Sequence, residues 1–236
     1  MWQVHHKREL SATWSACVAT DVNFEPDTDR WPELTVKVDP AGSGISLLVN
    51  QRSIGRLQPV GDQRFSPPCE DYIRGNQWHC VFPQDTNAFS MKVVWTMVEH
   101  SSSHLLIEPT ISIQTSLLDS QPVLDWVVPG VAVSVDLLND SSRPCPLVQS
   151  RSSEDQRSEQ SLGIVTVLSR SDASSTSDAS AHVEMRLRLF GEFLEKGVIR
   201  KSRPWILIQT PLAALSREQA THWQQRLEST PLPLTA

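Results

Sequence analysis

The residues best suited to chemistry in this chain are two histidines that flank a run of serines. His100 and His104 stand on either side of Ser101-Ser102-Ser103, and Glu99 directly precedes them. A hairpin tip could bring these side chains together, and imidazole and carboxylate groups are ligands that zinc accepts. His100 and His104 are therefore weak candidates for a metal site, although a solvated loop explains the same residues. The other histidines show no ligand spacing, so we expect no metal and no cofactor.

Carboxylate pairs are a second source of chemistry, because a glycosidase places two of them beside the bond that it cleaves. The acidic residues that stand beside strand-like or turn-like segments are Glu108, Asp119, Asp125, Glu192 and Glu195. Their positions in the sequence do not indicate which of them come within working distance. A sugar-active enzyme of glycosidase or epimerase type is therefore an alternative function, and no catalytic residue is assigned.

Common nucleophile and phosphate motifs are absent from the sequence. It contains no Gly-x-Ser-x-Gly, no Walker-type loop and no Gly-x-Gly-x-x-Gly, and a hairpin turn explains Gly42-Ser43-Gly44. The four cysteines are far apart and include no Cys-x-x-Cys pair, namely Cys17, Cys69, Cys80 and Cys145. Neither a zinc ribbon nor a redox motif is predicted, and we expect free thiols.

Tryptophan is unusually frequent, with eight residues against six Phe and one Tyr. Trp31 precedes Pro32 in a loop-like stretch, and Trp78 follows the polar run Arg74-Gly75-Asn76-Gln77. An exposed indole face can stack on a sugar ring, so Trp31 and Trp78 are the candidate binding residues. The alternative is that both fill the core, as large aromatic side chains usually do.

Net charge narrows the classes of partner. Lys and Arg total 21 against 27 Asp and Glu, a net charge of -6, which argues against a nucleic-acid binder. The nearest approach to a basic patch is interpreted as a solvated sheet face and consists of Arg186, Arg188, Arg200, Lys201 and Arg203. There is no apolar run of about 18 residues and no apolar signal core near Met1. We expect a soluble cytoplasmic protein without a membrane partner, and leave its oligomeric state open.

Alternating apolar and polar residues give the strongest structural signal, because successive strand side chains point to opposite faces. The apolar positions of one stretch are Phe89, Met91, Val93, Trp95 and Met97, and those of the next are Leu105, Ile107, Ile111, Ile113 and Leu117. The short polar link over 99–103 predicts that these stretches form an antiparallel hairpin.

A second hairpin is predicted near the C-terminus. The alternating stretch 183–189 precedes a turn at Glu195-Lys196-Gly197, and 198–203 with 205–209 would return antiparallel to it. Pro204 cannot donate to a strand ladder and predicts a bulge or an edge. Further strands are predicted over 2–19, 33–38, 45–49, 78–82, 123–128, 131–137 and 162–169.

The remaining elements are one helix and two flexible loops. Ser216-Arg217-Glu218-Gln219 has the form of a capping box, and Ala220, Trp223 and Leu227 follow at helical spacing. Segments rich in Ser and charged residues predict flexible loops at about 139–161 and 169–181. Together these elements predict a single domain over 1–236, mainly β, which forms an antiparallel two-sheet sandwich or a distorted barrel with one C-terminal helix.

The leading functional hypothesis is a non-catalytic β-sandwich that binds a carbohydrate or a protein partner. It rests on the missing catalytic motifs and the surplus of Trp, and the carbohydrate version predicts an exposed Trp or a concave face. The enzyme alternative predicts two carboxyl groups about 5–9.5 Å apart in a cleft. A third alternative is a structural or assembly protein that pairs through an edge strand near Pro204.

Overall fold

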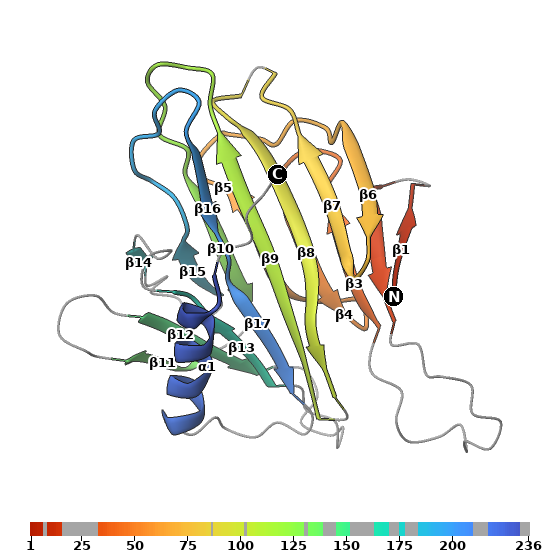
Figure 1. Ribbon diagram of the computed structural model, residues 1–236, viewed down its shortest axis with the longest axis vertical. Helices are drawn as coiled ribbons and strands as arrows, with labels where there is room; N and C mark the ends of the chain where they lie inside the picture. The colour runs from red at the N-terminus through yellow and green to blue at the C-terminus, as the bar shows by residue number, and fades with distance from the viewer. Residues whose placement is uncertain are drawn as a thin grey trace.

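Antiparallel strands make up most of the protein and form two facing sheets, with one helix outside them (Figure 1). We describe a computed structural model. The residues that it describes are 1–6, 9–15, 33–85, 87–101, 103–129, 132–138, 145–151, 163–169, 175–177, 184–209 and 217–231. Segments 132–138, 145–151 and 175–177 are described by their backbone alone. The predicted mainly β class and two-sheet sandwich are confirmed, and neither sheet closes into a barrel.

The first sheet begins at the N-terminus and has the strand order β1-β2-β3-β4-β5-β10-β15-β14. Its strands are β1 (Trp2–His5), β2 (Ser11–Trp14), β3 (Leu34–Val38), β4 (Ile45–Val49), β5 (Arg52–Pro59), β10 (Leu124–Pro129), β14 (Ser175–Ser177) and β15 (Glu184–Arg188). Every pairing in this sheet is antiparallel.

The second sheet has the order β11-β12-β13-β17-β9-β8-β7-β6, and a further strand, β16, also pairs with β9. Its strands are β6 (Glu70–Arg74), β7 (Gln77–Phe82), β8 (Ser90–His100), β9 (His104–Gln114), β11 (Ala132–Leu138), β12 (Cys145–Arg151), β13 (Gly163–Val167), β16 (Ile199–Ser202) and β17 (Trp205–Gln209). Strands β16 and β17 occupy one side of β9, so β9 lies inside the sheet.

The main core lies between the sheets and takes one apolar face from each. Trp95 on β8 and Trp126 on β10 meet across it, with ring centroids 6.3 Å apart. Gly55 on β5 permits this arrangement, because a Cβ atom at that position would lie 2.2 Å from the Trp126 ring. A side chain there would displace a fully buried indole, so the close approach requires glycine.

A smaller core lies on the outer face of the second sheet, beneath helix α1 (Arg217–Ser229). Leu227 of the helix is fully buried there, and Trp223 packs at its margin. The sheet contributes Leu106, Val165, Val167, Trp205 and Leu207. The predicted C-terminal helix is therefore confirmed, while its proposed cap, Ser216, lies outside the described residues.

The first predicted hairpin is confirmed and the second is wrong. Strands β8 and β9 pair antiparallel from Ser90 to His100, as their alternation indicates. Strand β15, however, pairs with β10 in the first sheet, while β16 and β17 pair with β9 in the second. The connection between β15 and β16 crosses from sheet to sheet and buries Leu189, Phe190 and Leu194. Pro204, predicted to mark a bulge or an edge, lies between β16 and β17, which both pair with β9.

Some strands lie where the sequence predicts none. Strand β12 falls within the flexible loop predicted at about 139–161, and β14 within that predicted at about 169–181. The rest of those two loops lies mostly outside the described residues. Strands β5 and β6 were not predicted, because neither alternates cleanly. Within the part of the chain that the structure describes, no helix is long and apolar enough to cross a membrane.

Candidate functional site

Of the two tryptophans predicted to bind a ligand, the structure describes only Trp78. Trp78 is fully buried, which contradicts its predicted exposure. It lies on β7 at the same parity as Cys80 and Phe82, so its side chain faces the main core and packs against Trp2 at a centroid distance of 6.4 Å. The polar turn before it belongs to a hairpin tip and does not expose it. Trp31 lies outside the described residues.

The other described tryptophans offer no sugar platform either. Those in the main core are Trp2, Trp14, Trp95 and Trp126, and Trp205 is buried in the smaller core. Trp223 is half-buried, and Arg226 lies over its ring at 5.1 Å from the centroid. The surplus of Trp therefore serves packing in the part of the chain that the structure describes.

The two candidate metal ligands, His100 and His104, point to different neighbours. His100 packs edge-on against Trp14, with ring centroids 5.6 Å apart. His104 instead joins a chain of polar groups at the tip of the β8–β9 hairpin. Ser101 Oγ lies 2.9 Å from His104 Nδ1, and His104 Nε2 lies 3.0 Å from Glu99 Oε1. Among the described residues, no three His, Cys, Asp or Glu side chains are placed to hold a metal.

This chain of contacts has the order of a nucleophile, a base and an acid, but its members are already engaged. The Ser101 hydroxyl accepts bonds from the backbone N–H groups of Ser103 and His104, at 3.3 and 3.2 Å. Glu99 Oε2 lies 2.7 Å from an Arg226 nitrogen. The Arg226 bond lowers the pKa of Glu99, and the His104 bond lowers it further, against the effect of burial. The cluster therefore fastens helix α1 to the hairpin tip.

The candidate acid–base carboxylates lie in different surroundings. Glu108 is buried and accepts a 2.6 Å bond from Trp205 Nε1, with Arg203 at 3.8 Å. Asp125 is buried in the first sheet against Arg188 at 2.8 Å, and Glu192 lies in an exposed loop against Arg200 at 2.6 Å. Asp119 and Glu195 are exposed in loops. Each of the three bonded carboxylates has its own cation.

The run of basic residues near the C-terminus is mostly neutralised by the same contacts. Arg188, Arg200 and Arg203 have the partners just named, and Arg186 pairs with Glu184. Cys69 and Cys80 are free thiols, as expected, and burial raises the pKa of Cys80. The side chains of Cys17 and Cys145 are outside the described residues.

One cleft of about 290 Å³ opens between the ends of β1, β2 and β3 and the segment 65–68. Its walls include Leu10, Val38, Phe65 and Pro67, and its rim carries Glu9 and Asp39. Lys37 Nζ lies 3.1 Å from Glu9, and bonds from Ser43 and the Ala41 backbone lower the pKa of Asp39. No tryptophan is among its described walls, so it lacks the platform that the carbohydrate hypothesis requires.

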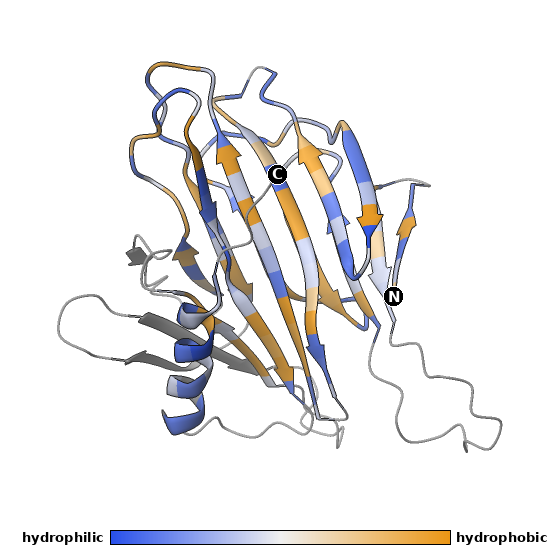
Figure 2. Ribbon diagram, viewed as in Figure 1, coloured by the Kyte–Doolittle hydropathy of each residue, from blue (hydrophilic) through white to orange (hydrophobic). Residues whose placement is uncertain are grey.

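The most unusual surface is an apolar end of the sandwich that sequence reasoning missed. Eight large apolar side chains are exposed among the described residues. Four of them come from two connections, β9–β10 and β15–β16, and a fifth is the first residue of β16. These five define the apolar loop end: Leu117, Leu118, Phe193, Val198 and Ile199. Leu118 is the most exposed, at 81%. Figure 2 shows the apolar colouring of both connections above the strands.

Backbone bonds hold the two connections of the apolar loop end together. Gly197 N–H donates to Thr115 O at 2.9 Å, and Leu194 N–H donates to Ser120 O at 2.9 Å. Gln114 adds a side-chain bond to Gly197 O at 3.2 Å. The buried side chain of Leu194 anchors the second connection in the main core. The exposed apolar groups therefore stand on a fixed framework.

Charged residues of both signs surround the apolar loop end. The anions are Asp119, Glu192 and Glu195, and the cations are Lys196, Arg200 and Lys201. Three of each sign give no net charge. A hydrophobic centre with a mixed polar rim is the usual composition of a protein interface.

The sequence hid this surface because Leu117 keeps the apolar parity of β9 and was predicted to lie on its buried face. Strand β9 ends at Gln114, so Leu117 lies beyond the sheet. The signal available was the adjacent pair Leu117-Leu118, because two consecutive apolar residues cannot both face one core from one strand.

The comparisons with known proteins gave no match, whether to a protein family, to a curated protein or to a solved structure.

Proposed function

We propose that this protein is a non-catalytic binding module that docks a partner protein on the apolar loop end. The observation that carries the proposal is that five exposed apolar side chains gather on two bonded connections and the first residue of β16. Apolar surface of this kind is costly in water, and contiguous patches on folded proteins commonly mark interaction sites. The protein version of the binding hypothesis is favoured over the carbohydrate version because Trp78 is buried.

The charge around the patch supports a protein partner over a membrane. Peripheral proteins use a surplus of Lys and Arg to reach anionic lipid, at about 1 kcal/mol per residue near the surface. The three cations around the apolar loop end are balanced by three anions. A rim of both signs fits the mixed surface of another protein.

The test begins with a photoreactive residue at position 118 to identify the bound partner in cells. The purified partner is then measured against Leu118→Ser, Phe193→Ser and a control, Ile73→Ser, which removes an exposed side chain from β6. We expect each loop variant to weaken binding by roughly tenfold or more, since an anchor residue contributes about 2 kcal/mol. The control should bind as wild type does.

Two results would overturn the proposal. One is a partner whose affinity is the same for Leu118→Ser, Phe193→Ser and wild type. The other is flotation of the protein with vesicles of neutral or anionic lipid that is lost in the two loop variants, which would assign the apolar loop end to a membrane.

A further inference from the structure

The outer face of the second sheet is only partly covered by helix α1. The helix covers the side of β9 that meets β17, while the outer faces of β6, β7 and β8 extend beyond it (Figure 1). On that uncovered part, two neighbouring rows of side chains cross the strands. The first row consists of residues in register on β6, β7 and β8, namely Tyr72, His79 and Val94. The second row consists of residues in register on β8, β9 and β16, namely Lys92, Ser112 and Lys201.

His79 is the unusual member of the first row. Its ring is stacked on Tyr72 with centroids 4.5 Å apart and planes 10° apart, and the residue is 7% exposed. Neither ring nitrogen has a hydrogen-bond partner among the described groups. A neutral imidazole offers one donor and one acceptor, and burying both without partners costs stability.

The second row brings a cation beside that ring. Lys92 Nζ lies 3.4 Å from the Tyr72 hydroxyl and 5.9 Å from the centroid of its ring. Tyr72 lies on β6 and Lys92 on β8, so the Lys92 side chain reaches across β7, the strand that carries His79. Ser112 lies on β9, on the opposite side of β8 from this contact.

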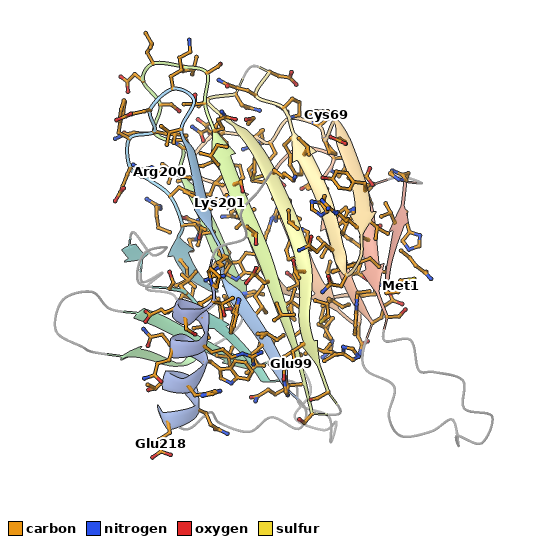
Figure 3. The ribbon with its side chains drawn as sticks, in the orientation of Figure 1. Met1, Cys69, Glu99, Arg200, Lys201 and Glu218 are labelled. Carbon is orange, nitrogen blue, oxygen red and sulfur yellow. The ribbon has the colours of Figure 1, made fainter. Side chains whose placement is uncertain are left out.

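Charge on this part of the sheet contrasts with the acidic chain as a whole. The outward-facing cations of β6, β7 and β8 beyond the helix are Arg74 and Lys92, against one carboxylate, Glu70, while the whole chain carries a net charge of -6. Lys201, labelled in Figure 3, lies farther along the second row, in register with Ser112 of β9. Positive charge beside the unpaired ring nitrogens of His79 is the composition that an oxyanion requires.

We propose that Lys92, Tyr72 and His79 form a binding site for one oxyanion, the phosphate or carboxylate group of a ligand. Lys92 would supply the charge, Tyr72 an O–H donor and His79 an N–H donor. The site is independent of the apolar loop end, because it lies on the sheet face and uses none of the residues of that patch.

Binding at this site is coupled to protonation of His79. Burial lowers the pKa of His79, and the charges of Lys92 and Arg74 lower it further. The groups that face the ring are Tyr72 and Arg74 from β6 and Lys92 from β8, with Glu70 one row away. A bound anion offsets the two cations and favours the protonated ring, which has two N–H donors. Affinity should therefore rise as the pH falls.

The test is isothermal titration of the full chain with inorganic phosphate and, separately, with acetate, at constant ionic strength and at pH 6 and pH 8. We expect saturable binding of at least one anion, tighter at pH 6. Lys92→Met should weaken it by about tenfold or more, the effect of losing one charge-assisted bond. Lys92→Arg should retain most of it. The matched control is Lys37→Met on the first sheet, where Lys37 pairs with Glu9.

A second readout is the NMR titration of the His79 ring, whose pKa should rise when the tighter anion is saturating. Preference for phosphate assigns a phosphorylated ligand, and preference for acetate assigns a carboxylate ligand. Absence of saturable binding by both anions at pH 6 overturns the proposal. Equal affinity of Lys92→Met and Lys37→Met also overturns it. Leu118→Ser should leave anion binding unchanged. The anion-binding proposal and the protein-docking proposal can therefore fail independently of each other.

Discussion

The two ends of strand β9 differ in how their surface groups are satisfied. At the hairpin end, His104 and Arg226 both bond to Glu99, and Arg226 lies over the rings of Trp205 and Trp223. At the other end, the connections around Leu118 and Phe193 are bonded through their backbones, but their apolar side chains face solvent. Glu99 and Arg200 mark the two regions in Figure 3.

The difference shows what helix α1 does for this fold. The outer face at the hairpin end is apolar, and the chain supplies its own cover in Leu227 and Trp223. The apolar loop end is comparably apolar, yet no described element covers it. This contrast supports our proposal that the second apolar surface is buried against a partner protein.

The largest expected loss of stability comes from removing Arg203, the buried cation that bonds helix α1 to the second sheet. Arg203 donates to Leu227 O at 2.8 Å and to Pro231 O at 3.1 Å, and lies 3.8 Å from buried Glu108. Arg203→Met should lower the free energy of unfolding by about 3–5 kcal/mol, because it leaves a buried carboxylate without its counter-charge. Urea unfolding measures the loss, and hydrogen exchange should show α1 opening first.

The matched control for that change is Arg200→Met at the apolar loop end. Arg200 pairs with Glu192 in a solvent-exposed contact at 2.6 Å. Exposed pairs contribute about 0–1 kcal/mol, so this variant should unfold nearly as wild type does. Equal losses of unfolding free energy in the two variants would contradict the distinction between the helix-covered hairpin end and the uncovered apolar loop end.

A smaller effect is expected from Glu99, and it depends on pH. Its pKa is lowered in the folded protein, chiefly by the Arg226 bond, so its ionised form stabilises the fold above the unfolded pKa of about 4.5. Glu99→Gln should cost about 0.5–1 kcal/mol at pH 7, a value reduced by solvent screening. The difference between wild type and variant should shrink as the pH falls below about 4.5. A difference that stays constant from pH 7 to pH 3 would rule out the ionised contact as its source.

The smallest effect on stability is expected at the centre of the apolar loop end. Leu118→Ser should change the free energy of unfolding by less than about 0.5 kcal/mol, because an exposed side chain contributes little packing. Thermal and urea unfolding provide the measurement. A loss of unfolding free energy above about 1.5 kcal/mol would show that Leu118 packs within the fold, which would contradict its proposed role in partner binding.

Local patterns predicted strands well where one face is buried and the other is polar. The alternation from Met91 to Met97 and from Leu105 to Ile113 specifies β8 and β9, and the tight link between them specifies their pairing. The same kind of pattern misled the second hairpin, because alternation shows which face of a strand is buried but not which sheet the strand joins. The crossing of the 189–198 connection depends on Leu194 reaching the main core.

The site residues were predicted less well for related reasons. Trp78 was interpreted from the polar turn before it, although its parity with Cys80 and Phe82 already indicated burial. The contact of His104 with Glu99 followed from the hairpin, but the partner that completes the cluster, Arg226, comes from a distant helix. His79 and Lys92 become neighbours only through the register of β7 and β8, which the sequence does not specify.

The position of β9 has a consequence for how the chain folds. Its second side is closed by β16 and β17, which come from the far end of the sequence, so Ile107 meets Ile206 only late in chain growth. Proteins dominated by such distant pairings fold over milliseconds to seconds. A chain that stops before Ile199 would leave one side of β9 open, and an unpaired apolar strand is a template for aggregation. Loss of residues 199–236 should therefore yield insoluble protein, even though no strand of the first sheet comes from them.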